Sequence, residues 1–151
     1  LEDAPDSAGT YIDRGNLADI LYWSPGGDQQ RAIQNYEIAK VEVEAYLQLN
    51  PGDLEALAWK AMYLAMLGER QAAEAVLTRV LEADDERVET LYKAAIIYQH
   101  FGQKEKAVNY LARSLETGFS ARRARNEPIF RESPELRELL SNYPDEGGPC
   151  P

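Results

Sequence analysis

The sequence predicts an all-α fold built from consecutive helical hairpins, and three observations support this prediction. Apolar residues recur at spacings of three and four along the chain from about Thr10 to Leu140. Proline and glycine fall between these periodic segments and not within them, as expected of turns that join helices. A pattern of three residues also returns after 34 residues, which indicates a repeated structural unit.

The repeated pattern is a glycine, then an alanine, then a larger residue. Glycine accepts the left-handed backbone of a turn after a helix, and alanine lets two helices approach closely. The larger residue, one helical turn later, fills the remaining gap. The three copies are Gly68-x4-Ala73-x3-Leu77, Gly102-x4-Ala107-x3-Leu111 and Gly27-x4-Ala32-x3-Tyr36.

The first hairpin is predicted to contain a helix from residue 10, a loop lengthened by residues 23–26, and a helix over 28–49 that Asp28 caps. Gly27 and Gly68 are 41 residues apart, seven more than the repeat, and seven residues are about two helical turns. We therefore expect a long second helix of roughly 33 Å that projects beyond its neighbours. The projection is either an interaction site or ordinary variation in length.

Two more hairpins follow with one plan, and the chain ends in short helices. The periodicity predicts helices over 54–67, 70–83, 87–101 and 104–117, with Gly68, Gly102 and Gly118 as stops. Segments 120–126, 128–130 and 133–140 are predicted to form two short helices that cover the end of the stack. The resulting division is a tail (1–9), three repeats (10–52, 53–86 and 87–119), capping helices (120–142) and a flexible tail (143–151). No strand is predicted.

Composition restricts the class of partner. Sixteen Lys and Arg residues against twenty-six Asp and Glu residues give a formal net charge of −10, which disfavours nucleic acid and anionic lipid. The basic cluster of Arg122, Arg123 and Arg125 is interpreted as a solvated helix start. No apolar run reaches the roughly 18 residues of a membrane span, so no direct membrane insertion is expected. The first residue, Leu1, favours a domain excised from a longer chain.

The sequence contains no recognisable catalytic or metal-binding set. His100 is the only histidine, and the only cysteine, Cys150, lies in a predicted tail. Residues 24–28 have two glycines but lack the Gly-Lys-Ser/Thr of a phosphate-binding loop, and the acidic residues 82–86 lack the order of a calcium loop. We therefore predict a protein that is not an enzyme, with no catalytic residue, metal or cofactor.

The repeats resemble the tetratricopeptide repeat, whose 34-residue pattern combines W-x2-LG-x2-Y with A-x3-F. Residues that match in size are Tyr11, Gly15, Ala32 and Tyr36 in the first repeat, Leu57, Ala61, Leu64, Ala73 and Leu77 in the second, and Leu91, Ala94, Ala95, Tyr98, Ala107 and Leu111 in the third. Arg14, Lys60 and Asp85 depart from it. The resemblance implies a right-handed α-solenoid of about three hairpins with C-terminal capping helices.

The C-terminal part also looks similar to the repeat regions of bacterial signalling proteins, such as transmembrane transcriptional activators and serine/threonine kinases. The residues that carry this likeness are Gly118-Phe119-Ser120, Asn-Glu-Pro-Ile-Phe (126–130) and Ser-Pro-Glu-Leu (133–136). Such regions are regulatory or partner-binding modules. The cytoplasm is the favoured compartment, with the periplasm as the alternative for a domain of a membrane-anchored regulator.

In this family the first helix of each repeat lines a concave groove, which suits a helix or an extended peptide. Carried over by alignment, the expected partner-binding residues are Ile12, Asn16, Asp19 and Ile20; Glu55, Ala58, Trp59, Met62 and Met66; and Glu89, Tyr92, Lys93, Ile96, Gln99 and His100. Only Asn16 and Lys93 match the clamp by which some relatives hold a terminal carboxylate, so a carboxylate-ended peptide is not expected to bind.

Three functional hypotheses follow from this resemblance. The first is a non-catalytic scaffold that binds a peptide or helix of a partner protein, or of its own parent chain, in the groove. The alternative is a self-association module of a larger bacterial regulator, which would make the protein a homo-oligomer. An enzyme is the weakest hypothesis, since it requires side chains distant in sequence to meet in a deep polar pocket.

Overall fold

The computed structural model describes residues 7–144, and these residues form helices and no strand, which confirms the predicted all-α class. The helices are α1 (Ser7–Trp23), α2 (Gln29–Leu49), α3 (Leu54–Met66), α4 (Arg70–Ala83), α5 (Val88–His100), α6 (Lys104–Glu116), α7 (Ala121–Arg125), α8 (Pro128–Arg131) and α9 (Pro134–Ser141). The first helix begins three residues before the predicted start. Cys150 and most of the two predicted tails lie outside the described residues.

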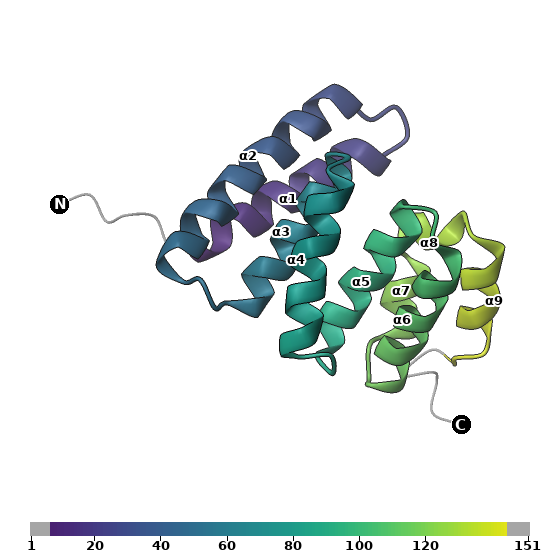
Figure 1. The fold of residues 1–151 in the computed structure, drawn as a ribbon. Coiled ribbons are helices and arrows are strands. Elements are labelled where there is room, and N and C mark those ends of the chain that lie inside the picture. The colour runs from purple at the N-terminus through teal and green to yellow at the C-terminus, as the bar shows by residue number, and fades with distance from the viewer. Residues whose placement is uncertain (1–6, 145–151) are drawn as a thin grey trace. The chain divides into compact units, whose positions relative to one another are not determined.

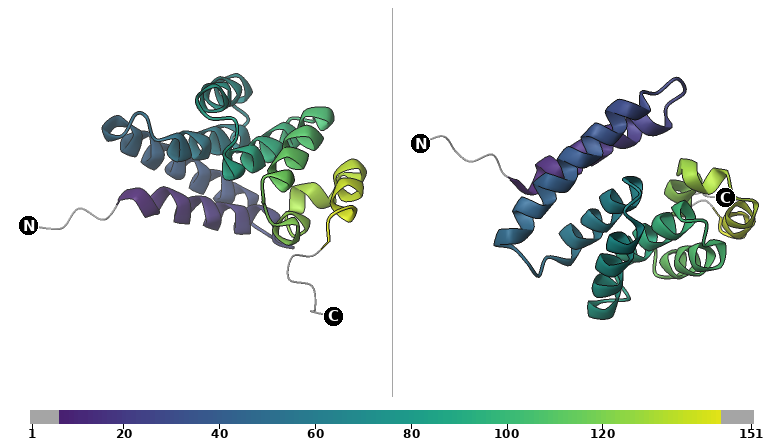
Figure 2. Two further views of the ribbon diagram at one scale, coloured as in Figure 1. Left: turned by 90° about the horizontal axis from the view of Figure 1, so that it is seen from below. Right: turned by 45° about the horizontal axis from the view of Figure 1, so that its top comes forward.

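The chain divides into two compact units between Ala83 and Asp84. The N-terminal unit contains α1 to α4, and the C-terminal unit contains α5 to α9. Within each unit consecutive helices pack as pairs, α1 with α2, α3 with α4 and α5 with α6 (Figure 1). Figure 2 shows the α1–α2 pair in two further views. The predicted hairpins are therefore present.

The turns after α3 and α5 are equivalent. Gly68 has φ 78° and Gly102 has φ 74°, the left-handed conformation that glycine adopts without strain. The amide of Glu69 donates to the Leu64 carbonyl at 2.9 Å, and that of Gln103 donates to the Tyr98 carbonyl at the same distance. This i to i−5 bond defines a Schellman motif, which satisfies carbonyls at a helix end. The residues that follow the turns, Ala73, Leu77, Ala107 and Leu111, are fully buried.

The first turn uses a different glycine from the predicted one. The positive φ, 71°, belongs to Gly26 and not to Gly27. Gly27 lies against the end of α1, where a Cβ would come within 2.2 Å of the Leu21 carbonyl oxygen. The loop over 24–28 is longer than the turn over 67–69 and contains two glycines. Gly26 adopts the left-handed conformation, and Gly27 lets the loop pack closely against the end of α1. Asp28 caps α2 as predicted, since its carboxylate accepts from the Arg31 amide.

Helix α2 is the long helix that the spacing predicts. It contains 21 residues, whereas α3 contains 13 and α4 contains 14, and at 1.5 Å per residue it measures about 31 Å. One face is buried along nearly its whole length, by Ala32, Tyr36, Ala39, Val43 and Leu47. These residues recur at spacings of three and four, which places them in one stripe.

The C-terminal segment forms three short helices, where two were predicted. Pro128 and Pro134 each occupy the first turn of a new helix, where the missing N–H is not needed. The segment 128–130 therefore makes a separate turn of helix. Within the C-terminal unit α8 packs on α5 and α9 packs on α6, so these helices cover part of the α5–α6 hairpin. Phe119, Ile129, Phe130, Leu136 and Leu140 are buried there.

Candidate functional site

The groove residues predicted in the N-terminal unit differ in their exposure. Asn16, Ile20 and Glu55 are exposed, and the side chain of Ile20 keeps 62% of its surface in solvent. Ile12, Asp19, Trp59 and Met66 are half-buried, while Ala58 and Met62 are buried. Helices α1 and α3 therefore offer a mixed apolar and polar surface, with Ile20 as its most accessible large apolar side chain.

A tyrosine cluster holds the helices of this unit together. The Tyr63 hydroxyl donates to the Tyr11 carbonyl at 2.6 Å, which joins α3 to α1. The Tyr36 hydroxyl donates to the Asp19 carboxylate, which joins α2 to α1. Burial raises the pKa of Asp19 above its usual value, and the bond from Tyr36 only partly offsets this increase. Asp19 thus has a structural partner within the unit.

The groove residues predicted in the C-terminal unit lie on α5 and are largely buried. Tyr92, Lys93 and Ile96 keep 7–8% of their surface exposed, while Gln99 and His100 are half-buried. The Tyr92 ring stacks on Phe119 with 3.8 Å between centroids, and its hydroxyl donates to Glu127 at 3.1 Å. Burial is the main cause that raises the pKa of Tyr92, and the neighbouring Glu127 carboxylate raises this pKa further. Tyr92 therefore packs in the core of its unit instead of lining an open surface.

Every large hydrophobic side chain that is clearly exposed among the described residues lies on the first hairpin: Leu17 and Ile20 on α1, and Ile33, Ile38, Val41 and Leu49 on α2. Exposed apolar residues that gather in one area mark interaction surfaces. The α2 residues were absent from the predicted site. The signal was present in the sequence as a second apolar stripe on that helix, with Ile38, Val41, Ala45 and Leu49 at spacings of three and four.

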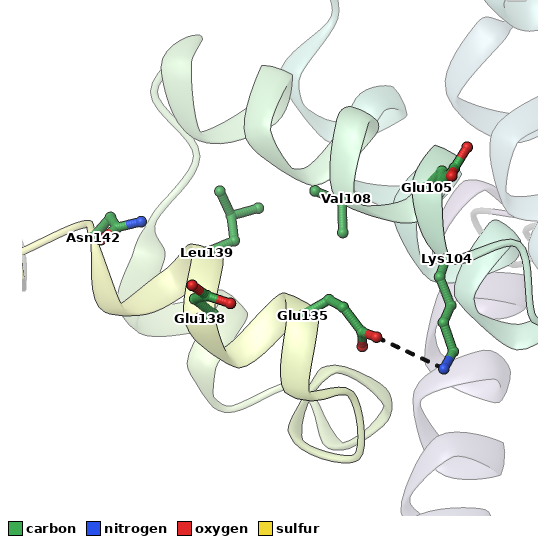
Figure 3. A pocket seen from close by; sticks show the side chains of 7 residues that line it. All are labelled: Lys104, Glu105, Val108, Glu135, Glu138, Leu139 and Asn142. Carbon is green, nitrogen blue, oxygen red and sulfur yellow. Dashed lines mark ion pairs between the residues drawn. The ribbon is translucent and has the colours of Figure 1, made fainter.

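A hollow of about 720 Å³ lies between α6 and α9 in the C-terminal unit. Figure 3 shows Val108 of α6 and Leu139 of α9 across it, with carboxylates at its edges. Lys104 pairs with Glu135 at 3.8 Å. The backbone amide of Glu135, the Ser133 hydroxyl and Lys104, in that order, lower the pKa of the Glu135 carboxyl. Because Glu135 lies in the first turn of α9, its charge also stabilises that helix.

The described part of the chain offers no assembled metal centre, since no three His, Cys, Asp or Glu side chains there could hold an ion together. His100 is half-buried, with its ring centroid 5.9 Å from that of Phe101. In the same residues no helix has the length and apolar character required to cross a membrane. Comparisons with protein-family models, curated proteins and solved structures found no match.

Proposed function

We propose that this chain is a non-catalytic protein-binding scaffold of the tetratricopeptide type, a right-handed solenoid that binds a helix or extended peptide along the first helices of its repeats. The ligand is a segment of a partner protein or of the parent chain. The observation that carries the proposal is the equivalence of residues 34 positions apart. Turn glycines, i to i−5 bonds and buried alanine and leucine positions recur in both units, as a repeat architecture requires.

The surface of α1 and α3 supports a binding role for the N-terminal unit. Ile20 and Asn16 of α1 are exposed, and Trp59 and Met66 of α3 are half-buried. Such a surface combines an aromatic ring, a flexible thioether and polar groups, and it accommodates the apolar side of a peptide. Because Asp19 and Tyr92 are engaged within their own units, the exposed α1 residues are the ones to change in a test of binding.

The test is affinity capture from a lysate of the source organism with three forms of the full chain, followed by binding measurements with the purified candidate. The groove variant is Asn16→Ala/Ile20→Asp. The matched control is Val41→Asp on α2, where the side chain is 64% exposed and a substitution leaves the core intact. Circular dichroism establishes that all three forms are folded.

We expect a partner that wild type and the Val41→Asp variant bind equally, and that the groove variant binds at least about tenfold more weakly, a difference of roughly 1.4 kcal/mol. A purified partner that binds all three forms alike would contradict a site on α1. A partner lost only with Val41→Asp would move the binding surface to α2.

A further inference from the structure

Helix α2 carries a second apolar stripe opposite its buried face. Ile38, Val41 and Leu49 keep 42%, 64% and 83% of their surface exposed, and Ala45 between them is exposed as well. These four residues are termed the outer face of α2. The helix needs none of them for packing inside the unit, because a different stripe, from Ala32 to Leu47, already packs there. The outer face is thus an apolar surface without a role in the fold.

The shape of the outer face suits another helix. Val41, Ala45 and Leu49 are four residues apart and form one ridge, in which the small Ala45 leaves a notch between two larger side chains. From Ile38 to Leu49 the face extends for about 16 Å at 1.5 Å per residue. That length matches about three turns of a partner helix, whose larger apolar side chain would fill the notch over Ala45.

The edges of the outer face are acidic. With Ile38 and Val41 at the seam positions of a heptad, Glu37 and Glu44 lie on one edge and Glu42 lies on the other. Glu37 is exposed, and Glu44 is 3.7 Å from Lys60 in a pair that solvent reaches; such pairs contribute about 0–1 kcal/mol. Glu42 is 3.6 Å from Arg14, and its second carboxylate oxygen is buried. Lysine or arginine of a partner can therefore compete for Glu37 and Glu44.

These edges disfavour a second copy of the chain as the occupant. In a parallel pair of α2 helices Glu37 of one copy would face Glu42 of the other. In an antiparallel pair Glu42 would face Glu42, and Glu37 would face Glu44. Like charges oppose each other in both arrangements, and each copy carries a formal net charge of −10. A helix with basic edges meets neither obstacle.

We propose that the outer face of α2 docks a basic amphipathic helix of a partner protein, with an apolar residue over Ala45 and lysine or arginine beside Glu37 and Glu44. This surface is separate from the proposed groove on α1 and α3, and it stands whether or not that groove binds a ligand. The chain then holds two protein segments through two different helices of its first hairpin.

The test uses two synthetic probes on the full, isotope-labelled chain. The first is a helical peptide of about 15 residues with leucine at spacings of three and four and lysine elsewhere. The second has glutamate in place of lysine. Amide chemical shifts are followed in wild type, in Val41→Asp/Leu49→Asp, and in the control Leu17→Asp, which changes an exposed apolar residue of α1 outside the proposed groove.

We expect the lysine peptide to shift amides of α2 around Val41 to Leu49 in wild type and in the Leu17→Asp control, and the Val41→Asp/Leu49→Asp variant to bind at least about tenfold more weakly. The glutamate peptide should cause no such shifts. Absence of shifts on α2, equal binding of both peptides, or equal binding by the double variant would overturn the proposal. So would sedimentation analysis showing a wild-type dimer that Val41→Asp/Leu49→Asp converts to a monomer.

Discussion

The ring of Tyr63 packs directly against the backbone of Gly15. A Cβ at residue 15 would lie 2.3 Å from the Tyr63 hydroxyl oxygen and 2.6 Å from the Cε1 atom of the ring, so only glycine allows this approach. This close approach allows the Tyr63 hydroxyl to donate a hydrogen bond to the Tyr11 carbonyl, one turn earlier in α1. Gly15 and Tyr63 together fix how α3 lies on the first hairpin.

Gly15→Ala is therefore expected to destabilise the protein, although alanine favours helix. The methyl group forces Tyr63 away from α1, which costs about 1–3 kcal/mol as overpacking does elsewhere. Urea denaturation followed by circular dichroism measures the change. The control is Gly9→Ala in the same helix, where a Cβ meets nothing within 4 Å, and where we expect a gain of up to about 1 kcal/mol. A neutral Gly15→Ala would contradict the proposed contact.

Gly68→Ala and Gly102→Ala should destabilise their hairpins by similar amounts. Both glycines have a positive φ and open space around the missing Cβ, so the penalty is conformational and amounts to roughly 1–2 kcal/mol. Thermal unfolding of the two variants measures it. Gly52→Ala is the control, because Gly52 has no positive φ and no close neighbour. Unequal penalties at Gly68 and Gly102 would count against the equivalence of the two turns.

The helices were predictable where local rules act alone. The helix over 70–83 has the predicted bounds because a glycine turn precedes it and its apolar stripe is regular. The first turn was misassigned because Gly26 and Gly27 are adjacent. Either glycine satisfies the local pattern, and only the packing of Gly27 against the Leu21 carbonyl decides between them.

The candidate site was less predictable, because burial depends on contacts distant in sequence. Helix α5 is buried at each position from Thr90 to Tyr98. Its periodicity does not reveal that Phe119 and Phe130, supplied by the C-terminal segment, cover Tyr92. On α2 the opposite occurs. A large apolar residue such as Leu49 remains exposed to solvent, because the neighbouring helices cover only one of the two apolar stripes of α2.

Tyr92→Ala is expected to destabilise the C-terminal unit and not to act as a neutral probe of binding. It removes a ring that stacks on Phe119 and meets Phe130 edge-on at 5.7 Å, and aromatic truncations of this kind cost about 3–5 kcal/mol. Tyr92→Phe keeps the ring and loses only the bond to Glu127, which should cost less than about 3 kcal/mol. Chemical denaturation distinguishes them. Equal stability of Tyr92→Ala and wild type would show that the ring is dispensable.

Asp19→Asn tests the charge that the fold buries beside Tyr36. The folded-state pKa of Asp19 lies above its ordinary value of 3.8, chiefly because of burial. The folded protein therefore holds this proton more tightly than the unfolded chain does. As the pH rises from below 3.8 through the folded-state pKa, ionisation of the Asp19 carboxyl consequently reduces the free energy of unfolding. An asparagine still accepts the bond from the Tyr36 hydroxyl and carries no charge.

We thus expect Asp19→Asn to be more stable than wild type near neutral pH, and the difference to disappear below the unfolded-state pKa, where the aspartate is protonated in both states. Urea denaturation of both proteins across this pH range gives the difference at each pH, from which titrations common to both proteins cancel. Asn16→Asp on the exposed side of the same helix is the control for an added charge and should show little pH dependence. Lower stability of Asp19→Asn at neutral pH would mean that the charged bond from Tyr36 outweighs the burial of the carboxylate.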